Sequence, residues 1–145
     1  VDVNNRRRAG QKIVFTNGCF DVLHAGHVQC LREAKAQGDW LVVGLNSDDS
    51  VRQLKGPERP INSIEQRAMV LSALQVVDAI VVFDEPTPLR VIQAIRPDVL
   101  VKAGDYRKDQ IVGADWVESY GGRIHIADYC EGLSTTRIVQ RIRAA

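Results

Sequence analysis

Residues 12–28 read KIVFTNGCFDVLHAGHV and contain two of the three histidines of the chain, His24 and His27. The first five residues are mostly apolar and β-branched, which is typical of a buried strand. Asn17-Gly18 is a turn signal, and from Gly26 onward apolar residues recur at helical spacing. The stretch therefore predicts a strand, a tight turn and a helix, with both imidazoles at the junction between turn and helix.

The same order of strand and helix repeats along the chain. Further buried strands are predicted at Trp40–Leu45, Val76–Phe83, Val99–Val101 and Arg123–Ile126. Further helices are predicted after a capping box of Asn62 and Glu65, near Thr87-Pro88, over Ile111–Tyr120, and after a cap at Ser134 or Thr135. The polar segment Asn46–Pro60 carries one glycine and two prolines and is predicted to be loop for much of its length.

Alternating strands and helices imply one parallel sheet with helices on both faces, joined by right-handed crossovers. We therefore expect a single Rossmann-like α/β domain over residues 12–145. Residues 1–11 are expected to form a polar N-terminal tail, in which Arg6-Arg7-Arg8 is solvated. Folds of this class bind ligands at the carboxyl ends of strands, near the switch in strand order. Gly18–His27 follows such a strand end and is the first candidate for the site.

The overall composition excludes several classes of function. The formal net charge is +1, so the chain lacks the basic excess that binding to nucleic acid or to a membrane surface requires. Its three cysteines, Cys19, Cys30 and Cys130, are odd in number and contain no C-x-x-C pair. This argues against a disulfide framework and a structural zinc site, and favours a reducing cytoplasm. No apolar run approaches the roughly 18 residues of a membrane span.

The histidine stretch fits an anion-binding site. A helix N-terminus carries unpaired N–H groups and a partial positive charge. His24 lies just before the predicted helix and His27 in its first turn, so both can direct ring N–H donors toward the same region. Gly26 removes a side chain where a phosphate needs close approach. This arrangement suits phosphoryl or nucleotidyl transfer, in which a protein mainly positions the reactants and stabilises developing charge.

The residues alone leave three other interpretations open. The two histidines could share a metal ion, but no third ligand lies at a suitable spacing and His125 is distant in sequence. Cys19 could act as a nucleophile beside a histidine, although nothing marks it as activated. The pair could also be two helix-cap histidines without a function.

The pattern Gly18-x-Phe20-Asp21-x-x-His24-x-Gly26-His27 resembles the signature of the HxGH nucleotidyltransferases of the cytidylyltransferase-like family. The second signature of that family, a Ser/Thr-rich helix start near the C-terminus, resembles EGLSTTRI at residues 131–138. Further segments are similar to the adenylyltransferase domains of ADP-heptose synthases and their stand-alone counterparts: NSDDSV (46–51), LKGPERPIN (54–62), EQR (65–67), PDVLVKAGDY (97–106) and LSTTRIV (133–139). Two departures are Ala103, where that pattern has glycine, and the lack of an attached sugar-kinase domain.

The resemblance implies that ATP reacts with D-glycero-D-manno-heptose 1-phosphate to give ADP-heptose and pyrophosphate, by in-line attack of the sugar phosphate on the α-phosphorus. It implies catalytic roles on the phosphates for His24, His27, Lys55 and Arg67. The nucleotide-binding residues that it implies are Thr16, Asn17, Gly18, Phe20, Gly26, Gly104, Asp105, Ser134, Thr135 and Thr136. On the sugar-phosphate side it implies Asn46, Asp48 and Arg59. Asp21 is expected to order the loop rather than to react.

The resemblance also implies Mg²⁺ that arrives with ATP, with no assigned protein ligand, and a homodimer. Residue types alone leave two alternative functions open. The first is a cytidylyltransferase for glycerol 3-phosphate or a similar small phosphate, which would differ in the loops at Asn46–Pro60 and Ala103–Lys108. The second is a non-catalytic nucleotide sensor, which the intact histidine pair, Lys55 and the hydroxyl cluster at residues 134–136 argue against.

Overall fold

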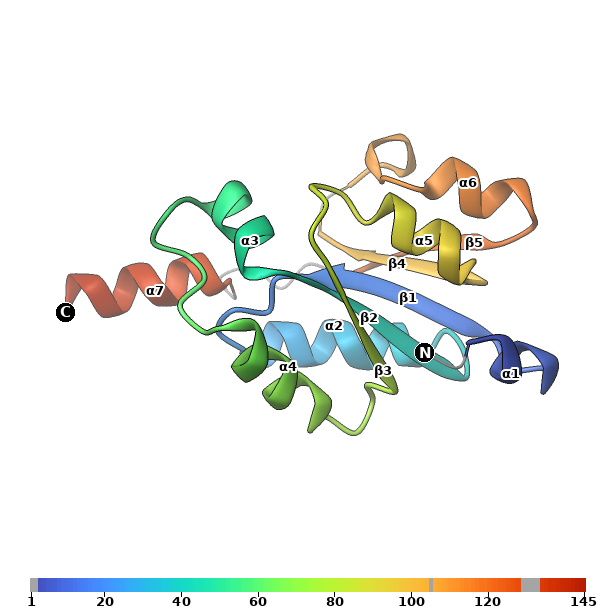
Figure 1. The fold of residues 1–145 in the computed structure, drawn as a ribbon, viewed down its shortest axis with the longest axis horizontal. Coiled ribbons are helices and arrows are strands. Elements are labelled where there is room, and N and C mark those ends of the chain that lie inside the picture. The colour runs from blue at the N-terminus through green and yellow to red at the C-terminus, as the bar shows by residue number, and fades with distance from the viewer. Residues whose placement is uncertain (1–2, 105, 129–133) are drawn as a thin grey trace.

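The computed structural model describes residues 3–104, 106–128 and 134–145. Within this part of the chain the strands form one five-stranded parallel sheet in the order β3-β2-β1-β4-β5 (Figure 1). The strands are β1 (Ile13–Gly18), β2 (Trp40–Asn46), β3 (Ala79–Phe83), β4 (Val99–Ala103) and β5 (Arg123–Ala127). The predicted parallel α/β architecture is confirmed.

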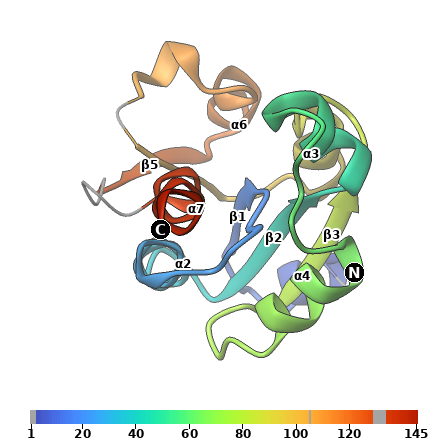
Figure 2. The same cartoon turned by 90° about the vertical axis from the view of Figure 1, so that its left-hand side faces the viewer.

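Helices cover both faces of the sheet (Figures 1 and 2). Residues of α2 (Ala25–Lys35) and α4 (Ile64–Ser72) pack on one face, and those of α5 (Leu89–Ile95) and α6 (Ala114–Ser119) pack on the other. The remaining described helices are α1 (Val3–Arg8), α3 (Asp48–Lys55), the 3-10 turn η1 (Lys108–Gln110) and α7 (Thr135–Ala144). Across the described residues, each helix is too short or too polar to cross a bilayer.

Two hydrophobic clusters lie on opposite faces of the sheet. Side chains of each strand point alternately into one cluster and the other. In β1, Phe15 points into the cluster that contains Ile92 of α5, whereas Val14 points into the cluster that contains Leu31 of α2. Phe15, Val14, Ile92 and Leu31 are fully buried. Burial on both faces explains why the central strands read as continuous apolar runs rather than as alternating patterns.

The strand order fixes where a ligand site can form. From the central β1, the chain builds β2 and β3 on one side and then β4 and β5 on the other. The direction of winding therefore reverses between β1 and β4, and ligands of open α/β sheets bind in the crevice at that point. The carboxyl ends that flank the crevice are Asn17-Gly18 of β1 and Lys102-Ala103 of β4.

The N-terminal segment differs from the solvated tail that was expected over residues 1–11. Residues 3–8 form α1, and Val3 is buried in the core. The guanidinium of Arg7 donates a hydrogen bond of 2.9 Å to the carbonyl oxygen of Arg96, just after α5. Carbonyl groups at the end of a helix attract cations. This partner lies far away in sequence, so the arginine cluster alone could not reveal it.

The segment at residues 46–60 is also more regular than the predicted loop. Its residues 48–55 form α3, and the side chain of Ser47 caps this helix by accepting a hydrogen bond of 3.2 Å from the Ser50 backbone N–H. Similarly, Ser63 rather than Asn62 caps α4. The glycine and prolines later in the segment indicate a turn. The serine directly after β2 is nevertheless an N-cap signal, and it predicts the start of a helix.

Candidate active site

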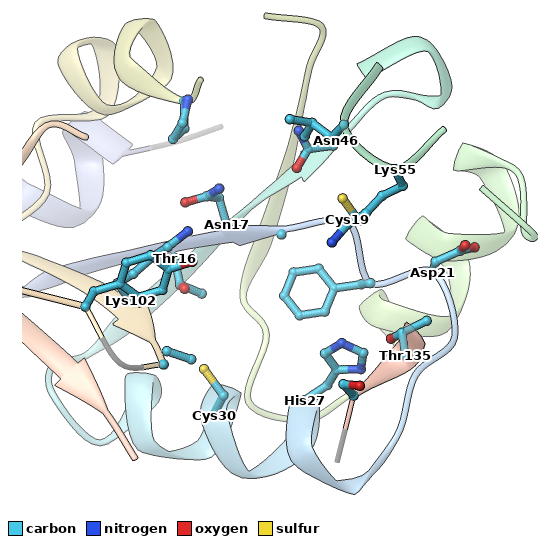
Figure 3. A pocket seen from close by; sticks show the side chains of 18 of the residues that line it. Thr16, Asn17, Cys19, Asp21, His27, Cys30, Asn46, Lys55, Lys102 and Thr135 are labelled. Carbon is cyan, nitrogen blue, oxygen red and sulfur yellow. The ribbon is translucent and has the colours of Figure 1, made fainter. Parts of the chain in front are cut away.

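A cavity of about 920 Å³ lies at the carboxyl ends of the strands. Figure 3 shows side chains that line it. Most of the predicted site residues are among its lining residues: Thr16, Asn17, Gly18, Phe20, His24, Gly26, His27, Asn46, Lys55, Arg59, Gly104, Ser134, Thr135 and Thr136. Arg67 and Asp48 are not among them. Asp105 lies outside the described residues.

The histidine pair forms the N-terminal cap of α2. Nδ1 of His24 accepts a hydrogen bond of 3.1 Å from the Gly26 backbone N–H, and Nδ1 of His27 accepts one of 3.2 Å from the His24 backbone N–H. The two ring centroids are 3.9 Å apart. Because a neutral imidazole carries one proton and both Nδ1 atoms act as acceptors, each ring carries its proton on Nε2.

The surroundings of the pair favour neutral rings. Burial lowers the pKa of His24. Burial, and after it the neighbouring charge of His24, lowers the pKa of His27 to about 4. A second positive charge so close to the first would be costly. At neutral pH the pair therefore supplies N–H donors without adding positive charge.

Nε2 of His24 is buried and has no hydrogen-bond partner among the described residues. A buried N–H without a partner costs about 1–3 kcal/mol. His24 also lines the cavity. The structure thus keeps an unused donor at the helix N-terminus, where an anionic oxygen is attracted by the helix dipole.

Phe20 packs against His27. Its backbone has φ 47°, a left-handed conformation that costs free energy for a side chain of this size. Its side chain is buried, and its ring lies 5.2 Å from that of His27. A Cβ at Gly18 would lie 2.9 Å from the Phe20 ring, so glycine is required there by close packing.

The N-terminus of α7 lies against the same loop. Ser134 caps this helix by accepting a hydrogen bond of 3.1 Å from the Arg137 N–H. It is one of the two residues that were predicted as the cap. The Thr135 hydroxyl donates a hydrogen bond of 3.2 Å to the carbonyl oxygen of Val22. Figure 3 shows Thr135 and His27 on the same side of the pocket. The two sequence motifs, which lie far apart in the chain, therefore meet at one cavity.

Lys55 ends α3 and its side chain is exposed to the cavity, with the ammonium group directed inward in Figure 3. Gly56 follows with φ 104°, a conformation that favours glycine and turns the chain sharply after the lysine. A long, flexible side chain at a helix end can reach a phosphate group bound in the cavity. The predicted position of Lys55 at the site is in keeping with such a role.

Asp21 orders the loop, as expected. Its carboxylate accepts hydrogen bonds from the backbone N–H groups of Ile61 and Asn62, and from Nε of Arg59 at 2.6 Å. Burial alone would raise the pKa of Asp21, but the hydrogen bonds and the charge of Arg59 outweigh it and lower the pKa. Arg59 therefore lines the cavity with its charge already paired.

Arg67 is buried within the protein. It is 2% exposed, and its guanidinium donates to the carbonyl oxygens of Cys19, Asn46 and Asn62 and to a carboxylate oxygen of Asp48. It thereby joins the segments that follow β1 and β2 to the start of α4. Neither residue lines the cavity, and the two pair with each other. These contacts give Arg67 and Asp48 a role in positioning the segments, and their predicted contacts with the substrates stay predictions.

The remaining predicted residue on the sugar-phosphate side is Asn46. Its side-chain amide donates a hydrogen bond of 2.8 Å to the Ser50 hydroxyl, and the residue is buried at the cavity wall. Cys19 also lines the cavity, but burial raises the pKa of its thiol despite the nearby charges of Lys55, Arg67 and Arg59. A nucleophilic thiolate at Cys19 is therefore disfavoured.

The sequence interpretation missed Lys102, which lines the cavity from the end of β4. The signal was present, because a charged residue at the carboxyl end of a buried parallel strand lies at the edge where such folds bind ligands. Tyr106 and Cys30 also line the cavity without having been predicted there.

Residues 15–141 match the cytidylyltransferase-like family. The chain belongs to the cytidylyltransferase-like family. It is 57% identical over 136 residues to the bifunctional protein HldE of Syntrophotalea carbinolica, covering 94% of this chain and 28% of that protein. It is 58% identical over 139 residues to the bifunctional protein HldE of Wolinella succinogenes, covering 96% of this chain and 28% of that protein. The chain thus spans less than a third of the length of these curated relatives.

Solved structures agree with the fold. The lipopolysaccharide core biosynthesis protein of Thermoplasma volcanium superposes with a TM-score of 0.67 at 27% identity, over 83% of this chain and 98% of that one. The pantoate-beta-alanine ligase of Francisella tularensis, solved with beta-gamma ATP and beta-alanine, superposes with a TM-score of 0.63 at 16% identity, over 97% of this chain and 73% of that one. At that identity the second likeness concerns the fold alone. The family predicted from the histidine motif is confirmed.

Proposed function

We propose that this chain is an adenylyltransferase that joins ATP to D-glycero-D-manno-heptose 1-phosphate, giving ADP-heptose and pyrophosphate. The observation that carries the transfer chemistry is the meeting of the histidine pair and the α7 N-terminus at one cavity. The choice of sugar is supported by the family segments at residues 46–67 and 97–106, and by the high identity to bifunctional HldE proteins over nearly the whole chain.

In the proposed reaction, an oxygen of the sugar phosphate attacks the α-phosphorus of ATP while pyrophosphate leaves on the opposite side. A covalent enzyme intermediate is not required. The Nε2–H groups of His24 and His27 donate to the triphosphate, and the hydroxyls of Ser134 and Thr136, with the N–H groups at the start of α7, hold its distal end. The ammonium group of Lys55 stabilises the negative charge that develops on the leaving pyrophosphate.

The described residues also bear on the predicted Mg²⁺. They contain no cluster of three His, Cys, Asp or Glu side chains that could hold a metal ion. Both carboxylate oxygens of Asp21 accept hydrogen bonds from protein groups. The proposed ion is held mainly by phosphate oxygens and water, as Mg²⁺ often is. When bound with ATP, Mg²⁺ neutralises negative charge on the departing pyrophosphate.

The test is an assay of pyrophosphate release. ATP and CTP are each combined with the α and β anomers of the heptose 1-phosphate and with glycerol 3-phosphate. We expect turnover with ATP and one heptose anomer. Turnover with CTP and glycerol 3-phosphate alone would establish the cytidylyltransferase alternative. Tight ATP binding by calorimetry without pyrophosphate from any acceptor would establish the nucleotide sensor.

The resemblance further leads us to propose a cytoplasmic homodimer. Light scattering after size exclusion measures the mass directly. A mass of one chain at micromolar concentration would contradict the dimer without affecting the proposed reaction.

A further inference from the structure

Lys102 is the last but one residue of β4 and is half-buried at the cavity. It lies beside the point where the winding of the sheet reverses, since β4 pairs with β1. Its ammonium group lies 5.3 Å from the centroid of the Tyr106 ring. Figure 3 shows Lys102 on the side of the pocket near Thr16 and Asn17, whereas Lys55 extends from the other side.

Lys102 is one of the few positively charged side chains at the cavity. Among the described residues, the lysine and arginine side chains that line the cavity are those of Lys55, Arg59 and Lys102. Arg59 is paired with the buried carboxylate of Asp21 at 2.6 Å. Lys55 and Lys102 form no ion pair with any residue in the described part of the chain, from which Asp105 is excluded. The histidines contribute donors but no charge.

A cation held in a half-buried wall without a carboxylate is unfavourable. The Tyr106 ring offsets part of that cost, and an anionic ligand would offset more of it. Burial lowers the pKa of Lys102, and the nearby charge of Lys55 adds to this effect, whereas Cys19 and Cys30 oppose it. An anion between the two lysines would remove both penalties. In the proposed reaction two negatively charged phosphoryl groups must approach each other. Positive charge from the protein is most useful at that point, because it reduces their mutual repulsion.

We propose that Lys102 binds a phosphoryl oxygen of the reacting pair, either on the α-phosphate of ATP or on the phosphate of the acceptor, from the side of the cavity that faces Lys55. This inference rests on the proposed transfer reaction and names a further substrate-contacting residue for it. Lys102 balances the repulsion between the two phosphoryl groups, which the neutral imidazoles of His24 and His27 do not.

Three variants test the proposal. Lys102→Met keeps the length and packing of the stem and removes the charge, and Lys102→Arg keeps the charge. Lys12→Met is the matched control, because Lys12 is exposed directly before β1, at the opposite end of the sheet. We expect Lys102→Met to lower kcat/KM by roughly 100-fold or more, Lys102→Arg to retain more activity than Lys102→Met, and Lys12→Met to match the wild type.

Binding measurements identify the phosphate and do not require the sugar to be correct. Calorimetry with the unreactive α,β-methylene-ATP reports on the α-phosphate. Titration of inorganic phosphate into the protein saturated with that analogue reports on the acceptor phosphate. We expect Lys102→Met to weaken one of these two affinities by about 10- to 100-fold, the value of a charge-assisted hydrogen bond.

The outcomes separate this inference from the proposed function. If the wild type fails to turn over heptose 1-phosphate, the proposed substrate is wrong, while a loss of either binding affinity in Lys102→Met still supports Lys102 as a phosphate ligand. If Lys102→Met binds both probes as the wild type does, the inference is overturned, whatever the wild type turns over. Lys102→Gln, which also removes the charge, supplies the same comparison should the methionine variant not fold.

Discussion

The hydroxyl of Thr135 donates a hydrogen bond of 3.2 Å to the carbonyl oxygen of Val22, although 113 residues separate the two in sequence. Val22 belongs to the loop that carries the histidines, and Thr135 is the first residue of α7. The bond fixes two helix N-termini, those of α2 and α7, at one cavity. Both N-termini direct partial positive charge toward the same place, which is the arrangement that a polyphosphate requires.

Replacing Thr135 by valine should therefore weaken ATP binding. Thr135→Val keeps the shape of the side chain but leaves the Val22 carbonyl without its donor, at a cost of about 1 kcal/mol or more. We expect roughly tenfold weaker binding of α,β-methylene-ATP by calorimetry. Thr135→Ser retains the hydroxyl and is expected to bind like the wild type. Equal affinities for Thr135→Val and the wild type would show that the contact does not organise the site.

His24 has two separable roles, because its Nδ1 caps α2 and its Nε2 is the unused donor. His24→Asn should preserve the cap, since asparagine is among the best N-cap residues, whereas His24→Ala should cost about 0.5–2 kcal/mol of unfolding free energy. Both variants lose the ring N–H and should lose on the order of 100- to 1000-fold in kcat. Urea denaturation and single-turnover assays measure the two effects independently. Near-normal turnover of His24→Asn would assign the histidine to capping alone.

The histidine pair also predicts a pH dependence of stability. The folded state lowers the pKa of His27 to about 4, from an ordinary value of 6.5. Between these values the unfolded chain binds more protons than the folded one, so the free energy of unfolding falls as pH decreases from about 6.5 to about 4. His27→Gln should show a smaller decrease over this window. Urea denaturation at several pH values, with an NMR titration of the His27 ring, checks both statements, and identical slopes for the two proteins would refute the neutral ring.

The fold could be predicted to a large extent because its central strands, β1, β2 and β4, are mostly buried. β2 is buried at each position, and its residues 40–45 appear in the sequence as an apolar run. The Asn17-Gly18 turn and the histidine stretch were equally visible, since turn chemistry and helix capping depend on neighbouring residues. These local signals fix the central strand, the first helix and the junction between them.

The parts that escaped prediction depend on partners far away in sequence. A sequence shows that residue 67 is an arginine near a helix start, but not that its side chain turns inward to the carbonyl oxygens of Cys19 and Asn46. The same holds for Arg7 and its contact after α5. Lys102 is a different case, because its place at the carboxyl end of a buried strand is readable from the sequence alone.

Asp21 and Arg59 form a buried ion pair, with side chains 0% and 10% exposed, and the pair anchors the turn after α3. Asp21→Asn leaves the guanidinium without a counter-charge and should cost about 3–5 kcal/mol of unfolding free energy. Asp49→Asn is the matched control, because Asp49 pairs with Arg52 at the surface, where such pairs contribute about 0–1 kcal/mol. Urea denaturation of both variants decides the point, and a loss below 1 kcal/mol for Asp21→Asn would contradict the anchoring role.

Substitution of Arg67 can distinguish a residue that positions neighbouring segments from one that binds a phosphate. Arg67→Lys keeps the charge but cannot reproduce the four hydrogen bonds that the guanidinium makes, because an ammonium on a flexible stem lacks the planar fork of donors. We expect a loss of about 3 kcal/mol or more in unfolding free energy, because buried carbonyl oxygens are left without donors at about 1–3 kcal/mol each. The increase in melting temperature caused by saturating α,β-methylene-ATP should be as large as in the wild type. If Arg67 instead holds a phosphate, the ligand-induced increase will shrink while the ligand-free protein stays nearly as stable as the wild type.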